Sequence, residues 1–378
     1  MLRFKRPSPY FVYSPLAESR IMMLAKEIEE QDGDFRNRAI GTGPFILKSY
    51  ERNVRLVYER NPNYFKPGLP YLDGFVRQII PDPAAYEAAF FAGQVDDWQV
   101  PIDKVETLRQ REPSVPIFRR NSFRGYSTYH VAMRLDKPPF SDKRVRLAMA
   151  YAIDQNAIIR VIYRGNARIG INLPWLAAFE SEPGPEAYGP LTRFNPQEAR
   201  RLLAEAGYPN GFEAKLEWTQ YGPYDPDLLQ LIQQQLGAVG IRVTLQRLET
   251  ITFITRFYSN AREELAYGFI QTFPQDWTMM VYLTRSSGKG QNVWGIKDPE
   301  MDQVAQQIKE AAGDPARARA LFRRMWELDL DRLYFIPLPD PPTYNAFRSY
   351  VHNWITNDRT QFPDWGARQF EIIWTSRK

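Results

Sequence analysis

The chain offers few side chains for metal or thiol chemistry, because it has two histidines, His130 and His352, and no cysteine. Without cysteine there is no disulfide, no thiol nucleophile and no cysteine-based zinc site. Zinc and nickel sites usually recruit several soft or borderline ligands, so two histidines far apart in sequence predict no metal site. No cofactor is expected either. His130 follows Tyr129 at the end of an expected strand, where a hydrogen-bonded strand histidine and a ligand contact both stay open.

The usual signatures of nucleophilic and phosphate chemistry are also absent from the sequence. Composition leaves a Ser-His-Asp triad open, but no Gly-x-Ser-x-Gly elbow occurs. No Gly-x4-Gly-Lys-Ser/Thr loop occurs either. Among the carboxylates, Glu27, Glu29 and Glu30 fall on an expected exposed helix, and Asp96 and Asp97 at a strand end. A glycosidase pair is defined by a separation that sequence does not show, so no catalytic residue is predicted.

Aromatic side chains are the more informative group, with 9 Trp, 21 Tyr and 23 Phe in 378 residues. Several fall at expected strand ends or in loops: Trp98, Tyr126, Tyr129, Trp175, Trp218, Phe269 and Trp277. For any single one, packing in the core or in a loop is the alternative to ligand contact. As a set they favour a cleft that encloses a ligand with apolar walls and a few polar contacts.

Composition places the chain among packed globular proteins with room for two domains. It is 44% apolar and 14% aromatic, and its net charge of +5 is a small excess of 49 basic over 44 acidic residues. An arginine group on an expected helix indicates a solvated face rather than a nucleic-acid patch: Arg317, Arg319, Arg323 and Arg324. No run of eighteen apolar residues exists, and the Met1–Pro7 start has no signal-peptide core.

The elements that must position these side chains begin with the stretch from Lys137 to Asp154. Pro138 and Pro139 end the preceding strand, because proline supplies no donor to a ladder. Ser141 or Asp142 can cap the next helix, whose apolar residues then recur at helical spacing. Elsewhere strands at 55–58, 75–80, 212–219 and 241–245 alternate with helices at 84–92, 199–208, 227–238 and 251–257. Strands separated by helices of this length predict an α/β protein with a mostly parallel sheet.

The Lys137–Asp154 stretch resembles the "pPFsD-x-R-V-R-x-A-x-x-x-A-I-D" segment of the family 5 solute-binding proteins of ABC importers. These are the peptide, nickel and oligosaccharide receptors. Further runs are similar to the same family: Gly41-Thr42-Gly43-Pro44-Phe45, Gly93-Gln94-Val95-Asp96 and 292–302. The resemblance covers nearly the whole chain.

The resemblance implies a two-lobed periplasmic-binding-protein-like fold, of type II and the cluster C type, with mixed sheets flanked by helices. Residues 1–130 would form the C-terminal part of lobe I, 131–346 lobe II, and 347–378 the return to lobe I. In the family, a strand like Leu2–Pro7 lies well inside the protein, behind roughly a hundred or more residues. We therefore expect lobe I to be incomplete and the N-terminal third of such a receptor to be missing.

The resemblance also implies a function. A receptor of this family captures an extracytoplasmic oligopeptide-like or other small solute between two lobes and delivers it to an ABC transporter permease by hinge closure. The expected partners are the solute and the permease, with no nucleic acid, and the expected state is a monomer. The expected location is periplasmic or extracellular, membrane-associated through the importer. The alternative is a hydrolase or other enzyme on a two-domain α/β scaffold, since fold does not fix function.

Family resemblance places ligand contacts in three runs: 97–99, 127–130 and 268–276. The ligand-binding residues it implies are Trp98, Gln99, Tyr129, His130, Phe269, Gln271, Thr272 and Asp276. In the family's peptide receptors an acid at the position of Thr272 holds the ligand's amino terminus. A neutral hydroxyl does not compensate an ammonium brought out of water, so a peptide amine is not expected to be the main anchor. Substitution by Asp276, a few residues further on, stays open.

Overall fold

The computed structural model describes residues 26–33, 41–120, 129–171, 173, 175–269, 287, 292, 294–311, 314–353 and 370–376. They divide into two compact units. We call the unit of residues 129 to 342 lobe II, and the unit that combines 26 to 120 with 343 to 376 lobe I. The predicted strand at Leu2–Pro7 and the predicted site residues Gln271, Thr272 and Asp276 lie outside the described residues.

Lobe II is built on a five-stranded sheet with the strand order β10-β6-β9-β7-β8. Strand β6 is antiparallel to both β10 and β9, whereas β9, β7 and β8 run parallel to one another. The expectation of a mostly parallel sheet is therefore wrong, and the expectation of mixed sheets flanked by helices is confirmed. The strands are β6 Tyr129–Met133, β7 Phe212–Trp218, β8 Ile241–Arg247, β9 Leu265–Phe269 and β10 Phe335–Pro337.

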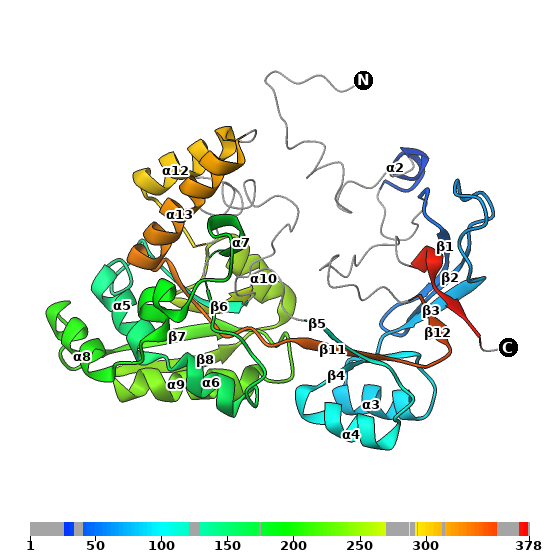
Figure 1. The fold of residues 1–378 in the computed structure, drawn as a ribbon, viewed down its shortest axis with the longest axis horizontal. Helices are drawn as coiled ribbons and strands as arrows, with labels where there is room; N and C mark the ends of the chain where they lie inside the picture. The colour runs from blue at the N-terminus through cyan, green and yellow to red at the C-terminus, as the bar shows by residue number, and fades with distance from the viewer. Residues whose placement is uncertain are drawn as a thin grey trace. The chain divides into compact units, whose positions relative to one another are not determined.

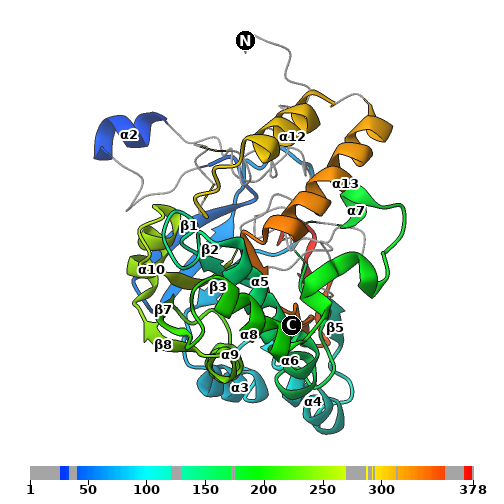
Figure 2. The ribbon, with the colours of Figure 1, turned by 90° about the vertical axis from the view of Figure 1, so that its left-hand side faces the viewer.

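Polar side chains fix the starts of many lobe II helices by accepting hydrogen bonds from their first free amides. Asp142, Asp154, Asn195, Asp298 and Asp314 cap α5, α6, α8, α12 and α13 in this way. Helices α12 and α13 lie side by side (Figure 1, Figure 2). The helices are α5 Lys143–Ala152, α6 Gln155–Val161, α7 Trp175–Ala178, η2 Pro185–Thr192, α8 Pro196–Glu205, α9 Asp225–Ala238, α10 Thr250–Tyr258, α12 Pro299–Glu310 and α13 Pro315–Arg332.

Lobe I contains two three-stranded antiparallel sheets, β1-β2-β3 and β4-β11-β5, and the short pair β12-β13. Its strands are β1 Phe45–Glu51, β2 Arg55–Arg60, β3 Gly74–Gln78, β4 Asp97–Val100, β5 Ile117–Arg120, β11 Thr343–Phe347, β12 Val351–His352 and β13 Trp374–Thr375. Its helices are α2 Lys26–Asp32, α3 Pro83–Phe91, η1 Ile102–Lys104, α4 Val105–Arg111 and η3 Phe370–Ile372.

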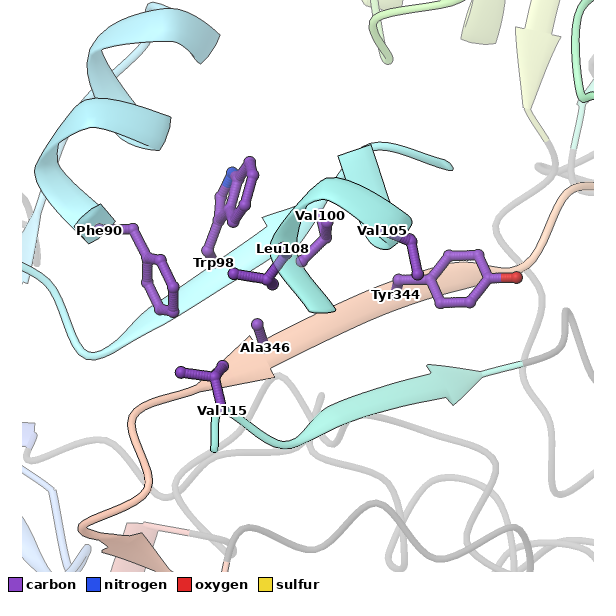
Figure 3. Close-up of a cluster of buried hydrophobic side chains, with 8 residues drawn as sticks. All are labelled: Phe90, Trp98, Val100, Val105, Leu108, Val115, Tyr344 and Ala346. Atoms are coloured by element: carbon purple, nitrogen blue, oxygen red, sulfur yellow. The ribbon is translucent and has the colours of Figure 1, made fainter. Parts of the chain in front are cut away.

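A hydrophobic core joins the sheet β4-β11-β5 to helices α3 and α4 (Figure 3). Its buried side chains are Phe90, Trp98, Val100, Val105, Leu108, Val115, Tyr344 and Ala346. The ring centroids of Phe90 and Trp98 lie 5.6 Å apart, and those of Phe91 and Trp98 lie 5.7 Å apart. Trp98 is 2% exposed and therefore belongs to the interior of lobe I.

Sheet pairing decides where the chain passes from one lobe to the other. Strand β6 begins at Tyr129 and pairs only within the lobe II sheet, among the strands described. Strand β11 begins at Thr343 and pairs with β4 and β5 of lobe I. Both crossings therefore precede the predicted boundaries at 130 and 346, because the strands at those boundaries already belong to the following lobe.

Candidate functional site at one end of the lobe II sheet

Four strands bring their ends together at one edge of the lobe II sheet. The pairing sets Tyr129, the first residue of β6, opposite Phe269, the last residue of β9. It also sets Trp218, the last residue of β7, opposite Arg247, the last residue of β8. Open α/β sheets bind ligands outside the carboxyl ends of their strands. This edge is therefore the candidate site, and the structure brings the predicted residues Tyr129 and Phe269 together there.

Three tyrosine rings pack together at this edge. The ring centroids of Tyr129 and Tyr267 lie 5.5 Å apart with nearly parallel planes, and those of Tyr129 and Tyr221 lie 5.9 Å apart. Tyr267 is fully buried, whereas Tyr129 and Tyr221 are partly exposed. The buried ring thus supports two rings that offer an apolar face and a hydroxyl to a solute.

A buried carboxylate holds the loop that carries Tyr221. Asp225, which is 5% exposed, accepts hydrogen bonds from the backbone N–H groups of Tyr221 at 2.6 Å and Gly222 at 2.8 Å. Its second oxygen accepts the hydroxyl of Tyr267 at 2.9 Å. Burial raises the pKa of Asp225, although these hydrogen bonds act in the opposite direction. The carboxylate therefore ties together the loop after β7, the first turn of α9 and strand β9.

The tyrosine hydroxyls at this edge stay protonated. Burial raises the pKa of Tyr129, and the neighbouring carboxylates of Asp225 and Asp340 raise it further. Burial and the Asp225 carboxylate raise the pKa of Tyr267 in the same direction. A protonated phenol can donate a hydrogen bond to a carbonyl or carboxylate of a solute. The edge is thus suited to binding, with no phenolate available as a base.

His130 points away from the candidate site, as the neighbour of Tyr129 on a strand must. It is fully buried, and its Nε2 atom accepts a hydrogen bond of 2.9 Å from the indole N–H of Trp294. The rings of Phe335 and Phe257 lie 4.9 Å and 6.0 Å from it. The structure therefore gives His130 the packing role that was the alternative to ligand contact.

Trp98 and Gln99 are neighbours on β4, and their side chains likewise lie on opposite faces of the sheet. Trp98 lies in the lobe I core, so its expected contact with a solute is replaced by contact with Phe90 and Phe91. Gln99 is exposed on the other face of the sheet, where its strand partner is Asn345. Of this pair, Gln99 is the side chain that remains open to a solute.

Residues missed by the sequence-based prediction complete the site: Tyr221, Asp225, Arg247 and Tyr267. A signal existed for Tyr221 and Asp225, since the run Tyr221-Gly222-Pro223-Tyr224-Asp225 follows a predicted strand and so leaves its carboxyl end. Within the described ranges, no three or more His, Asp or Glu side chains gather as a metal site would require. Nor does any described helix combine the length and apolar character needed to cross a membrane.

Comparison with known proteins decides the family. The model of the bacterial extracellular solute-binding proteins, family 5, matches residues 1–292. The chain belongs to the family 5 solute-binding proteins. Heme-binding protein A of Haemophilus influenzae is 31% identical over 215 residues, which cover 54% of this chain and 37% of that protein. Di/tripeptide-binding protein 3 of Pseudomonas aeruginosa is 26% identical over 332 residues, covering 84% of this chain and 59% of that protein.

Solved structures confirm the two-lobed periplasmic-binding-protein fold. The periplasmic binding protein DppA of Helicobacter pylori, in complex with a peptide, has a TM-score of 0.79 at 22% identity, covering 96% of this chain and 70% of that one. The murein tripeptide binding protein MppA of Escherichia coli has a TM-score of 0.82 at 18% identity, covering 98% and 72%. At these identities the likeness establishes the fold. This family 5 chain spans less than two thirds of the length of the two relatives named above.

Proposed function

We propose that this family 5 protein is a solute receptor of an ABC importer, which captures a peptide-like or other small solute and delivers it to the permease. The observation that carries the proposal is the edge of the lobe II sheet where Tyr129 meets Phe269, backed by the Tyr221 and Tyr267 rings. The partly exposed rings of Tyr129 and Tyr221 can bind a solute through apolar contact and hydrogen bonds, without a chemical reaction. The relatives named above are binding proteins, which supports a receptor over an enzyme.

The binding residues that we propose are Gln99 in lobe I and Tyr129 and Phe269 in lobe II, with Gln271, Thr272 and Asp276 from the sequence alone. We also propose a location outside the cytoplasm and contact with the permease, which membership of the family supports, and a monomeric state. No role in binding nucleic acid is proposed. Trp98 and His130 would act indirectly, through the cores that support β4 and β6.

We propose that the receptor holds its solute through groups other than a peptide amino terminus. Thr272 stands where the family's peptide receptors have an acid, and a hydroxyl does not neutralise an ammonium. Blocking the amine of a bound peptide should therefore leave its affinity unchanged within about threefold, which corresponds to less than about 0.7 kcal/mol.

Affinity selection with the full chain tests this function. Mixed-sequence libraries of two to five residues, unblocked or N-acetylated, are incubated with the chain, separated by size exclusion and identified by mass spectrometry. Retention of both forms, followed by similar dissociation constants in calorimetry, is the expected result. Retention of no library member rejects the peptide-like solute. Retention of the unblocked peptides alone shows that an amine is the anchor after all.

A further inference from the structure

A polar pocket of about 430 Å³ opens beside the candidate site, at the carboxyl ends of β7 and β8. Its walls are Thr219, Gln220, Arg247, Leu248, Glu249 and Thr250. The backbone N–H of Leu248 donates to the carbonyl of Trp218 at 2.8 Å, which extends the strand pairing to the base of the pocket. We call this space the Arg247 pocket.

The charge of Arg247 has no carboxylate to neutralise it among the described residues. Arg247 is exposed, and its guanidinium lies over the ring of Trp218, 5.5 Å from the ring centroid. Stacking on an indole limits the freedom of the guanidinium and leaves its N–H groups to other partners. The indole Nε1 of Trp218 is itself buried without a hydrogen-bond acceptor in the described part of the chain.

The single carboxylate in the pocket wall is already engaged. Glu249 accepts hydrogen bonds from the backbone N–H groups of Ile251 and Thr252, both at 3.0 Å, and so caps helix α10. Thr219 is buried, and its hydroxyl oxygen lies 3.1 Å from that of Thr250, so this pair presents hydroxyl groups to the pocket. The pocket wall therefore combines the Arg247 guanidinium and two hydroxyl groups with one carboxylate, whose oxygens are directed at the first amides of α10.

We propose that the Arg247 pocket receives a carboxylate of the solute, so that the receptor is specific for solutes with an acidic end. The inference rests on the proposed receptor function and adds the chemical class of the solute. A planar guanidinium binds a carboxylate through two parallel hydrogen bonds, and hydroxyl donors satisfy its remaining lone pairs. A solute that carries an amide at that end leaves the guanidinium without its charged partner.

The strand order also sets the length of the solute. Strands β6 and β8 are three positions apart in the order β6-β9-β7-β8, and neighbouring strands are about 4.8 Å apart. Tyr129 and Arg247 thus stand about 14 Å apart along the sheet edge. An extended peptide rises about 3.4 Å per residue, so about four residues reach from the tyrosines to the Arg247 pocket.

The test compares acid and amide forms of N-acetylated library peptides of two and four residues on the full chain. Affinity selection identifies the binders, and calorimetry then measures both end forms of each. For tetrapeptides we expect the acid to bind about ten- to a hundredfold more tightly than the amide, as for a hydrogen-bonded charge pair. Arg247→Met should remove this preference, and Arg247→Lys should restore part of it, because lysine keeps the charge without the fork.

Arg242→Met is the matched control, since Arg242 is exposed on the same strand at its opposite end. It should leave the acid preference unchanged. Equal binding of acid and amide tetrapeptides, or a preference that survives in Arg247→Met, overturns the inference while the receptor function stands. An equal acid preference for dipeptides overturns the predicted reach. Absence of any bound peptide rejects a peptide-like solute and overturns the inference, while a receptor for another small solute stands.

Discussion

Asp225 should be the residue on which the shape of the tyrosine-lined site depends most. Its carboxylate accepts three hydrogen bonds, from the backbone N–H groups of Tyr221 and Gly222 and from the Tyr267 hydroxyl. Asp225→Ala removes all three acceptors at once. Asp225→Asn keeps one oxygen for the two N–H groups and turns an amide N–H toward the Tyr267 oxygen, which can accept it.

The expected cost follows from these contacts. Each donor left without a partner in a buried setting costs about 1–3 kcal/mol. The N–H groups of Tyr221 and Gly222 are only partly buried, so water can replace part of what they lose. We expect Asp225→Ala to lower the free energy of unfolding of lobe II by about 3 kcal/mol, and Asp225→Asn by about 1 kcal/mol or less.

The pH dependence of the free energy of unfolding separates the hydrogen bonds of the Asp225 carboxylate from the effect of its ionisation. Burial raises the native pKa of Asp225 above the ordinary value of 3.8, so the native state holds this proton more tightly than the unfolded state. The contribution of Asp225 to stability therefore falls as the pH rises from 3.8 through the native pKa, and it is constant above that range. Asp225→Asn lacks this ionisation, so its stability relative to the natural chain should improve over the same range.

Urea denaturation of the full chain measures the free energies, and hydrogen exchange of peptides covering residues 219–230 reports on the loop itself. Asp225→Ala should speed the exchange of the Tyr221 and Gly222 amides, whereas Asp225→Asn should not. If alanine costs no more than asparagine in both measurements, the carboxylate does not hold the loop. The reasoning that places Tyr221 beside Tyr129 then fails.

Two further predictions test other parts of the structure. Trp98→Ala should destabilise lobe I by about 3–5 kcal/mol in urea denaturation, because it opens a cavity in the core. Gln99→Ala should change the free energy of unfolding by no more than about 0.5 kcal/mol. Equal effects would contradict the finding that these two side chains lie on opposite faces of the sheet. Burial alone would raise the pKa of Asp298, but hydrogen bonds from Tyr334, the start of α12 and Arg332 outweigh it and lower that pKa. Asp298→Ala should therefore lower the free energy of unfolding by about 2 kcal/mol at neutral pH. This difference should shrink as the pH falls below 3.8 through the native pKa of Asp298. A difference in thermal unfolding that stays constant across that range would contradict the lowered pKa of Asp298.

Local signals made much of the fold predictable from sequence. Asp142 and Asp298 each precede an apolar stretch at helical spacing, and both cap helices in the structure. The arginines predicted to form a solvated face, including Arg317 and Arg324, are exposed on α13. In each case residues within one or two helical turns determine where the helix begins or which of its faces is exposed, so a short stretch of sequence is enough to predict it.

The roles of Trp98 and His130 were not predictable in the same way. Each lies on a short strand, and the segments that cover one face of that strand come from elsewhere in the chain. Helix α3 covers the Trp98 face of β4, and Trp294, far along the chain, covers His130. The Pro/Gly-rich stretch at 182–190 largely forms η2, and the ring centroid of Tyr188 lies 5.9 Å from that of Trp326 on α13. Tertiary packing decides which of these side chains are buried, and a short stretch of sequence does not contain that information.

Hydrogen exchange of the full chain, with and without the tightest-binding library peptide, tests the central claim most directly. If the solute binds at the end of the lobe II sheet, exchange should slow in segments that contain Tyr129, residues 218–222 and Phe269. The same segments should lose this protection in Tyr129→Ala, which should also weaken binding by about tenfold, as expected when one aromatic contact is removed. Protection confined to other segments, such as α12 and α13, together with unchanged affinity in Tyr129→Ala, would place the solute elsewhere and contradict the account.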